Sequence, residues 1–466
     1  MILKIDSLLH LKDAPDHIIR QIKAELTIKN PDYVKKKRMG INRFACGPEY
    51  IKLCQEKNGI LIIPRGFYAR LYEITGNNLQ IVDERKLCPY IEFHRTPKLR
   101  DYQIPALELA RAWQQGCLIM PCGAGKTTTA MGIVADLMQP TLWITHTMDL
   151  LNQSMNCAIE TLGLTGRQIG IIQAENMSIG SHMTFATVQT LSKRDLSGIK
   201  NKFGCIIVDE SHLVYKDAAK ARMFESVISQ FPAYYRFGLT ASEFRSDGLI
   251  ETMFHVIGPK FYEVTQDDPR LQVVVPEVRF IPTQFTYEKD DDEEMLNTAR
   301  LISEMADNPD RNQIIMNVLY EIGPNDYCIV LGDSLDHLRK MKERVVRQGA
   351  RAAFVCGDTS KAERERIMSS MRNGMYNFLF ATYQLAKLGL DIPRLNRLVL
   401  MTPKKDNTSI QQSVGRIMRP FEGKNQPIVY DIYDEQMPLL RSWARERVRV
   451  YKSLGCSIIG GPRVRK

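Results

Sequence analysis

The chain has 466 residues, of which 44% are hydrophobic and 25% charged, a composition typical of a soluble globular protein with two or three domains. It contains no apolar run of about 18 residues, which argues against a membrane span. The N-terminus, MILKIDSLLHLKD, lacks a secretory pattern, so we expect a cytoplasmic protein.

The net charge is +10, and residues 1–100, with 19 Lys/Arg and 11 Asp/Glu, account for +8 of it. Such a concentrated basic excess favours a polyanion partner such as nucleic acid.

Residues 1–95 mix short strand-like runs, such as GILIIPRGF and NLQIVDERK, with one helical segment, HIIRQIKAEL. Frequent Gly and Pro residues separate these runs. We therefore expect a small accessory α+β domain that binds nucleic acid. Its candidate contacts form one basic cluster: Lys35, Lys36, Lys37 and Arg38.

From Leu99 onward the pattern changes to buried strands that alternate with helical segments, as in CLIMP followed by KTTTAMGIVADLM. The same alternation of apolar strand-like runs and helical segments returns after residue 300, with DYCIVLGD and SLDHLRKMKERVVRQG. Continuous apolar strands alternating with helices indicate parallel sheets covered on both faces. We expect an N-terminal domain over 1–95, a first α/β domain over 96–280, an acidic linker over 281–297, a second α/β domain over 298–440 and a basic tail over 441–466.

The stretch CLIMPCGAGKTTTAMGIV runs from a buried strand through a glycine-containing turn into a helix. Gly123 and Gly125 allow backbone N–H groups to close around phosphate oxygens. Lys126 can then reach the β- and γ-phosphates, while the Thr127 hydroxyl ligates Mg²⁺. The full predicted phosphate loop is Pro121, Cys122, Gly123, Ala124, Gly125, Lys126, Thr127 and Thr128.

A second signal is FGCIIVDESH, in which Asp209 and Glu210 follow the apolar run CIIV. Ligands bind at the carboxyl ends of parallel strands, so this pair is expected beside the phosphate loop. Asp209 is suited to hold Mg²⁺ and Glu210 to polarise the attacking water. The two signals together predict nucleoside triphosphate hydrolysis.

The order LRDYQ, PCGAGKT, DESH, GLTAS and QQSVGRIMRP, over about residues 98–425, resembles the motifs of the superfamily 2 helicases. That family often has Pro-x-G-x-G-K-T at its phosphate loop, so Met120 in place of the usual first glycine is no defect. The resemblance implies an ATPase that uses ATP and Mg²⁺. It also implies an α/β fold of two tandem RecA-like parallel-sheet domains, preceded here by the small α+β DNA-binding domain.

The resemblance assigns further nucleotide and coupling roles. Gln103 in LRDYQ matches an adenine-reading glutamine, and Arg100 accompanies it near the nucleotide. The motif GLTAS, which links hydrolysis to domain movement, contains Thr240, Ala241 and Ser242. Gly389 and Asp391, in ATYQLAKLGLDIP, are assigned to nucleotide binding.

The last motif places Gln412, Arg416 and Arg419 toward the γ-phosphate. Arginine from a second domain can neutralise the charge that develops on a transferring phosphoryl group. The spacing i, i+4 and i+7 predicts that one helix presents all three side chains on one face. With Lys126, Asp209 and Glu210, they complete the predicted catalytic set.

Family motifs that contact the nucleic-acid backbone match THTMDL, FATVQTL, LGDSLDHL and ATYQLAKLGLDIP. Hydroxyls, amides and helix N-termini suit such sequence-independent contact. The residues expected to make it are His146, Thr187, Gln189 and Thr382.

The N-terminal stretch and GLTASEFRSDGL are similar to phage and prokaryotic UvsW-like and XPB-like helicases, although Glu243 stands where proline is common. This similarity implies unwinding or branch migration of DNA forks, D-loops and four-way junctions in replication, recombination or repair. We expect a monomer in a bacterial cytoplasm or a phage-infected host, with a single-strand-binding or recombination protein as partner. Removal of residues 1–95 is expected to abolish junction binding and to spare basal ATPase.

Three alternatives remain open. The chain could be an RNA helicase, which the DESH motif permits. It could be the translocase subunit of a restriction-type nuclease system. A nucleic-acid-binding protein with a decayed motor is disfavoured, because Lys126, Asp209, Glu210 and Arg419 are intact.

Overall fold

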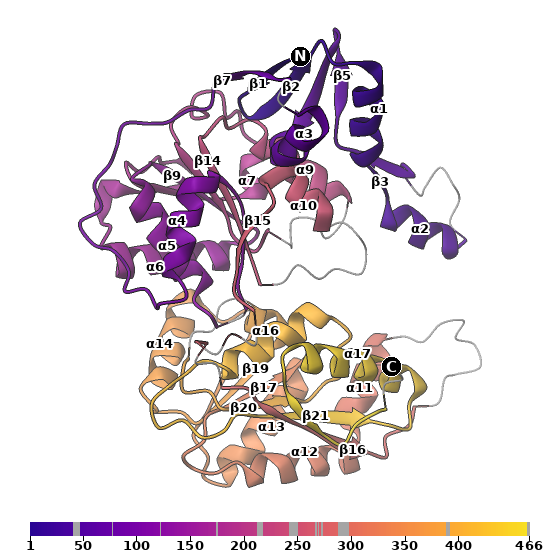
Figure 1. Ribbon diagram of the computed structural model, residues 1–466. Helices are drawn as coiled ribbons and strands as arrows, with labels where there is room; N and C mark the ends of the chain where they lie inside the picture. Colours follow the sequence, from indigo (N-terminus) through magenta and orange to yellow (C-terminus); the bar gives the residue numbers. More distant parts are fainter. Residues whose placement is uncertain are drawn as a thin grey trace. The chain divides into compact units, whose positions relative to one another are not determined.

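The structure is a computed structural model that describes residues 1–466 except 41–46, 77, 122, 174–175, 212–217, 242–249, 266–267, 269, 272–273, 288–297, 388–391 and 464–466. The chain forms two compact units. The first contains Met1–Pro121 and Gly125–Thr265, and the second contains Cys122–Ala124 and Gln266–Lys466 (Figure 1).

The first unit begins with a small α+β module. Its elements are β1 (Ile2–Ile5), β2 (Leu8–Lys12), α1 (Asp16–Glu25), β3 (Thr27–Lys29), α2 (Pro31–Arg38), β4 (Tyr50–Lys52), β5 (Gln55–Lys57), β6 (Ile60–Pro64), η2 (Arg65–Phe67), α3 (Tyr68–Thr75) and β7 (Gln80–Asp83). Five strands form a sheet in the order β5-β6-β2-β1-β7, and β3 pairs with β4 as a separate antiparallel ribbon. Alternate strand residues such as Leu9 and Leu11 pack against Ile18 and Ile22 of α1, as the periods of strand and helix require.

Two buried arginines fix this module to the rest of the first unit. Arg65 donates hydrogen bonds to the Gln115 side chain at 2.8 Å and to the Ala233 carbonyl at 2.5 Å. Arg236 donates to the Ser7 carbonyl at 3.1 Å. Both guanidinium groups are buried, and burial lowers the pKa of Arg65. One hydrophobic cluster also runs through the module and the following domain, so removal of residues 1–95 would expose part of the motor core.

The remainder of the first unit is a parallel sheet with helices. Its elements are α4 (Ile104–Trp113), β8 (Gln115–Ile119), α5 (Lys126–Leu137), β9 (Thr141–Thr145), α6 (Met148–Leu162), η3 (Gly166–Gln168), β10 (Ile169–Gln173), β11 (Asn176–Met177), β12 (Met183–Thr187), α7 (Val188–Leu191), β13 (Cys205–Val208), α9 (Ala218–Ile228), β14 (Tyr235–Thr240), α10 (Ile250–Ile257) and β15 (Lys260–Glu263). The strand order is β11-β10-β12-β9-β13-β14-β8-β15, and the pairings are parallel except at β11. Every residue of β8, β9, β12 and β13 is buried, which explains their continuous apolar runs.

The second unit is another parallel sheet. Its elements are β16 (Glu277–Thr283), α11 (Thr298–Asp307), α12 (Pro309–Glu321), β17 (Cys328–Gly332), α13 (Leu335–Arg347), β18 (Ala352–Val355), α14 (Lys361–Arg372), β19 (Phe378–Thr382), α15 (Tyr383–Lys387), β20 (Arg397–Leu400), α16 (Asn407–Ile417), β21 (Ile428–Asp434), α17 (Pro438–Ser453) and β22 (Ser457–Ile459). The strand order is β18-β19-β17-β20-β21-β16-β22. Within β17, Ile329 and Leu331 pack into the cluster that contains α16 and α17, whereas Val330 packs into the cluster of α12 and α13.

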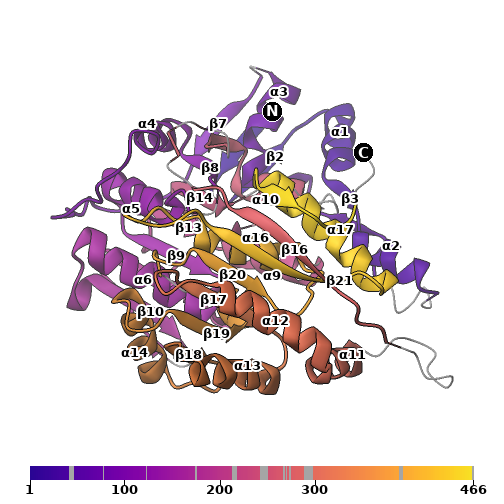
Figure 2. The ribbon, with the colours of Figure 1, turned by 90° about the horizontal axis from the view of Figure 1, so that it is seen from below.

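Helices therefore cover both faces of this sheet (Figure 2). The predicted α/β architecture of two parallel-sheet domains is confirmed. Within the described residues, the helices are all too short or too polar to traverse a bilayer.

The structure divides the chain differently from the prediction at two places. β16 pairs with β21 along all seven of its residues and so belongs to the second unit, although the predicted first domain extended to residue 280. The predicted basic tail over 441–466 instead supplies most of α17 and all of β22. Burial of Ala444, Val448 and Tyr451 on one side of α17 explains why a segment with many charges is part of the fold.

Replacement of Arg65 by alanine should destabilise the full chain by about 2–4 kcal/mol, because it leaves the Gln115 side chain and the Ala233 carbonyl buried without their donor. Urea unfolding measures this change. Arg70→Ala is the matched control, since Arg70 lies at the surface and pairs with the solvent-accessible carboxylates of Glu25 and Glu73, and it should have a much smaller effect on stability. Equal effects of the two changes would contradict a structural role for Arg65.

Candidate nucleotide-binding site

The carboxyl ends of β8, β13 and β14 bring the predicted nucleotide residues together in the first unit. β14 pairs with β13 on one side and with β8 on the other, all in parallel. Lys126 begins α5 after the loop that follows β8, and Asp209 directly follows β13. Thr240 is the buried last residue of β14, and its carbonyl accepts a hydrogen bond from the Met120 N–H at 3.0 Å.

The loop before α5 adopts a backbone that glycine permits. Gly123 and Gly125 have φ values of +85° and +81°, in the left-handed region. A Cβ atom on Gly125 would lie 2.6 Å from Nε2 of Gln103, so the close approach also requires glycine. The first hydrogen bond of α5 then runs from the Thr129 N–H to the Gly125 carbonyl, at 2.9 Å. Thr127 and Thr128 are half-buried in the first turn of α5.

Lys126 and Glu210 form an ion pair, with Nζ 3.0 Å from Oε1. Their side chains are 10% and 16% exposed, so little water screens the pair. Glu210 has a φ of +49°, in the left-handed region, which costs free energy for a residue with a Cβ atom and recurs at functional sites. The ion pair holds the Lys126 ammonium at the carboxyl ends of the strands.

Asp209 is buried beside this pair and is held at both oxygens. The Ser154 hydroxyl of α6 donates to Oδ2 at 3.1 Å, and the Glu210 N–H donates to Oδ1 at 2.9 Å. Burial raises the pKa of Asp209, and the adjacent Glu210 carboxylate raises it further. A buried carboxylate whose negative charge is under-compensated suits a divalent cation, and carboxylate and hydroxyl oxygens, as Asp209 and Thr127 carry, are ligands that Mg²⁺ prefers.

The residues expected to lie near the base are connected to the loop. Gln103 donates from Nε2 to the Gly125 carbonyl at 3.2 Å and accepts from the Arg100 N–H at 2.8 Å. The Arg100 guanidinium donates to the Tyr102 hydroxyl at 2.7 Å. Gln103 is buried and touches the phosphate loop in this structure.

The acidic motif is linked to the predicted coupling motif. The Ser211 hydroxyl donates to the Leu239 carbonyl at 3.1 Å, one residue before Thr240. Ser211 is fully buried, so this bond connects the strand end after β13 to β14. Ala241 follows Thr240, whereas Ser242 lies outside the described residues, as do Cys122, Gly389 and Asp391.

The predicted arginine face of the second unit is only partly correct. Gln412 and Arg416 lie on α16, but this helix ends at Ile417, so Arg419 follows in a loop. Pro420 and the turn after it favour this early end, because the residue before a proline disfavours helical geometry. Oε1 of Gln412 is buried and, among the described residues, has no hydrogen-bond donor. A buried acceptor of this kind fits a site that a ligand or a water completes.

The nucleic-acid candidates of the first unit converge at one sheet edge. Thr187 and Thr145 are cross-strand partners at the ends of β12 and β9. Directly after these strands, the Gln189 amide lies 3.0 Å from Nδ1 of His146. The Thr187 hydroxyl caps α7 by accepting the Thr190 N–H.

The remaining candidates lie elsewhere. Thr382 is half-buried at the end of β19 in the second unit. Lys36 and Lys37 are exposed on α2, and the Lys37 ammonium lies 5.8 Å from the Tyr33 ring centroid. The side chains of Lys35 and Arg38 lie outside the described part of the chain.

Sequence reasoning missed Ser154, which orients the Asp209 carboxylate. The sequence did carry a signal for it, since Leu151, Ser154, Ala158 and Leu162 form the buried stripe of α6 and the serine interrupts an apolar pattern.

The basic ribbon face of β3 and β4 was also missed. Lys29 pairs with Tyr50, and Thr27 with Lys52, so these side chains share one face opposite the Ile28–Ile51 pair.

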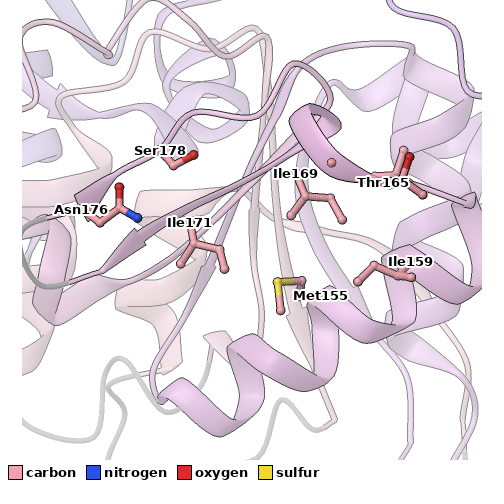
Figure 3. Close-up of a pocket in the computed structure, with 9 residues that line it drawn as sticks. Met155, Ile159, Thr165, Ile169, Ile171, Asn176 and Ser178 are labelled. Carbon is pink, nitrogen blue, oxygen red and sulfur yellow. The ribbon is translucent and has the colours of Figure 1, made fainter.

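A separate pocket of about 490 Å³ lies between α6 and the edge of the same sheet. Met155 and Ile159 of α6 face Ile169 and Ile171 of β10 across it (Figure 3). Its lining contains no charged side chain, so it lacks the groups that a triphosphate needs.

Two family models match the chain. Residues 96–245 match "Type III restriction enzyme, res subunit", and residues 310–420 match "Helicase conserved C-terminal domain". A protein of Acanthamoeba polyphaga mimivirus whose name describes an ATP-dependent RNA helicase is 27% identical over 93% of this chain and 81% of its own length.

Two further similarities extend the comparison. The DNA 3'-5' helicase XPB of Mycobacterium tuberculosis is 26% identical over 72% of this chain, which spans 60% of that relative. The structure of S. cerevisiae Dbp5 bound to RNA and ADP BeF3 aligns with a TM-score of 0.55 and 14% identity, over 78% of this chain and 90% of Dbp5. The latter supports the tandem RecA-like fold.

Ser154→Ala should raise the Mg²⁺ concentration needed for half-maximal ATPase by about tenfold, because it removes one of the two hydrogen bonds that orient Asp209. Ser197→Ala is the control, since Ser197 is an exposed loop serine bonded to Asp195. Titration of Mg²⁺ at saturating ATP measures the shift. An unchanged Mg²⁺ dependence in Ser154→Ala would show that Asp209 is oriented without it.

Proposed function

We propose that this chain, which belongs to the superfamily 2 helicases and is therefore an ATP-hydrolysing enzyme, is a DNA helicase or translocase that unwinds or branch-migrates forks, D-loops and four-way junctions. The observation that carries the motor part of the proposal is the Lys126–Glu210 ion pair beside buried Asp209. These three groups lie where parallel α/β sheets bind nucleotides.

ATP binding would use the loop and its lysine. The N–H groups around Gly123 and Gly125 and the Lys126 ammonium would hold the phosphates. Phosphate oxygens offer Lys126 a stronger anionic partner than one carboxylate, so nucleotide binding would release Glu210 to polarise the attacking water. Thr127 and Asp209 would hold Mg²⁺, which neutralises phosphate charge when bound.

The second unit would contribute to the same reaction through α16 and the loop after it. Arg416 and Arg419 are proposed to stabilise charge that develops on the γ-phosphoryl group. The buried Gln412 acceptor supports a polar contact there. The Ser211–Leu239 hydrogen bond supports a path from the acidic motif to Thr240, the proposed coupling residue.

Nucleic acid would be contacted at strand ends in both units. His146, Thr187 and Gln189 offer neutral donors and acceptors at the ends of β9 and β12, which suits sequence-independent phosphate contact. Thr382 is the corresponding proposal in the second unit.

The basic ribbon would grip duplex near a junction. Lys29, Tyr50 and Lys52 are exposed on one face of β3–β4, and α2 adds Lys37 beside Tyr33. Lysines neutralise phosphates, and an exposed aromatic ring offers a stacking surface at a frayed end. The XPB-like match supports DNA over RNA.

An RNA helicase is the second candidate, since the name of the mimivirus relative describes that activity over most of this chain. The restriction-subunit model that matches the first unit favours a translocase of a nuclease system as a third. We further propose that the enzyme acts as a monomer in replication, recombination or repair, in the cytoplasm, beside a single-strand-binding or recombination protein.

The ATPase rate should rise about tenfold or more with synthetic forks and four-way junctions, and less with single strands, linear duplex or RNA. Lys126→Ala should lower the stimulated rate by about 100-fold, because the phosphates lose their ammonium partner. Lys193→Ala, at an exposed lysine of the same unit, is the control. Stimulation by RNA alone would replace the branched-DNA proposal with the RNA one, and full activity of Lys126→Ala would reject the motor assignment.

The double change Lys29→Glu with Lys52→Glu should weaken junction binding and lower the slope of log affinity against log salt by about two, because two phosphate contacts are lost. Basal ATPase should be retained, since both lysines lie on the ribbon surface. Lys57→Glu, on β5 of the neighbouring sheet, is the control for added negative charge. Salt-dependent fluorescence anisotropy with a labelled junction measures the slope, and an unchanged slope would exclude the ribbon from the DNA-binding surface.

A further inference from the structure

The loop that carries Arg419 closes on itself through a lysine. After α16 ends, residues 421–424 form a turn in which the Lys424 N–H donates to the Phe421 carbonyl at 3.2 Å. The turn returns the Lys424 ammonium to the Arg419 carbonyl, with Nζ 2.7 Å from that oxygen. The same Nζ lies 3.2 Å from the Pro393 carbonyl. One partly buried ammonium therefore joins the backbone of Arg419 to the segment before β20.

Other contacts hold the two ends of this loop. The Arg394 guanidinium lies 5.0 Å from the Phe421 ring centroid and 5.4 Å from that of Tyr327. The Met418 carbonyl accepts the Val274 N–H at 3.2 Å. These contacts fix residues 418 and 421, and the Lys424 ammonium donates to the Arg419 carbonyl itself.

We propose that Lys424 is a positioning residue for the ATPase reaction, which fixes the backbone of Arg419 by bridging the Arg419 and Pro393 carbonyls. This inference rests on the catalytic role proposed above for Arg419. Lys424 contacts neither substrate nor metal in this role. It acts by limiting the directions in which the arginine side chain can leave the loop, and preorganisation of a charged donor is a large contributor to phosphoryl transfer.

The bridge depends on the charge of Lys424. Burial and, to a smaller extent, the nearby Arg419 guanidinium together lower the pKa of Lys424 to about 7. Arg394 and Glu422 are the other charged residues of the tethered segments, and Glu422 is exposed. Below its pKa the ammonium donates charge-assisted hydrogen bonds to both carbonyls, and above it the neutral amine donates weaker ones. The bridge should thus weaken as the pH rises through about 7.

The test compares kcat for ATP hydrolysis at saturating nucleic acid in the full-length protein from pH 6 to pH 9. Lys424→Met should lower kcat by about tenfold at pH 6.5 with the KM for ATP within about twofold of wild type. Lys424→Arg should restore kcat, because a guanidinium bridges two carbonyls and stays charged. The wild type should lose kcat as the pH rises above 7, and Lys424→Arg should not show this loss.

Lys452→Met, at an exposed lysine of α17, controls for loss of one positive charge in the same unit. A kcat of Lys424→Met equal to that of Lys452→Met would overturn the inference, and so would an alkaline loss that persists in Lys424→Arg. Arg419→Ala distinguishes failure of the positioning role of Lys424 from failure of the catalytic role of Arg419. If Arg419→Ala abolishes ATPase while Lys424→Met has wild-type kcat and pH profile, only the positioning role fails. If Arg419→Ala hydrolyses ATP normally, the proposed arginine role and the inference fail together.

Discussion

The chain must keep three charged groups, Lys126, Asp209 and Glu210, largely buried at the carboxyl ends of strands in one parallel sheet. Such burial costs free energy unless each charge has a partner. Here the ammonium pairs with Glu210, and Asp209 is held by a serine hydroxyl and a backbone N–H. The arrangement leaves negative charge in excess, which a divalent cation bound with the nucleotide would offset. The order of strands β13, β14 and β8 follows from the need to gather these groups at one end of the sheet.

Features that depend on short stretches could be predicted from the sequence. The apolar runs ending in Met120 and Val208 have two buried faces, so they could be recognised as parallel strands. Gly125, Lys126, Asp209 and Glu210 then follow from the rule that ligands bind at strand ends. Their spatial grouping in the structure agrees with that rule, while their catalytic roles remain proposals.

Features that depend on distant contacts could not be predicted. β16 looked like the end of the first domain, but its register with β21, about 150 residues later in the chain, places it in the second sheet. Arg419 has helical spacing from Gln412, yet α16 stops at Ile417 and the loop turns back through Lys424. Ser154 was visible only as a polar interruption in an apolar stripe, because its partner Asp209 is 55 residues away. In each case the local sequence shows one residue or segment of a contact, and its distant partner is identified only in the structure.

The buried arginines between the N-terminal module and the first parallel sheet have a mechanical consequence. Arg65 and Arg236, both buried, cross-link the module to that sheet through carbonyls on both sides. These buried hydrogen bonds oppose movement of the module, and of the ribbon it contains, relative to the first parallel sheet. Duplex bound at the ribbon would therefore be anchored to the first unit. The ribbon itself would not generate the movement that displaces a strand, and that movement would have to act against the anchored duplex.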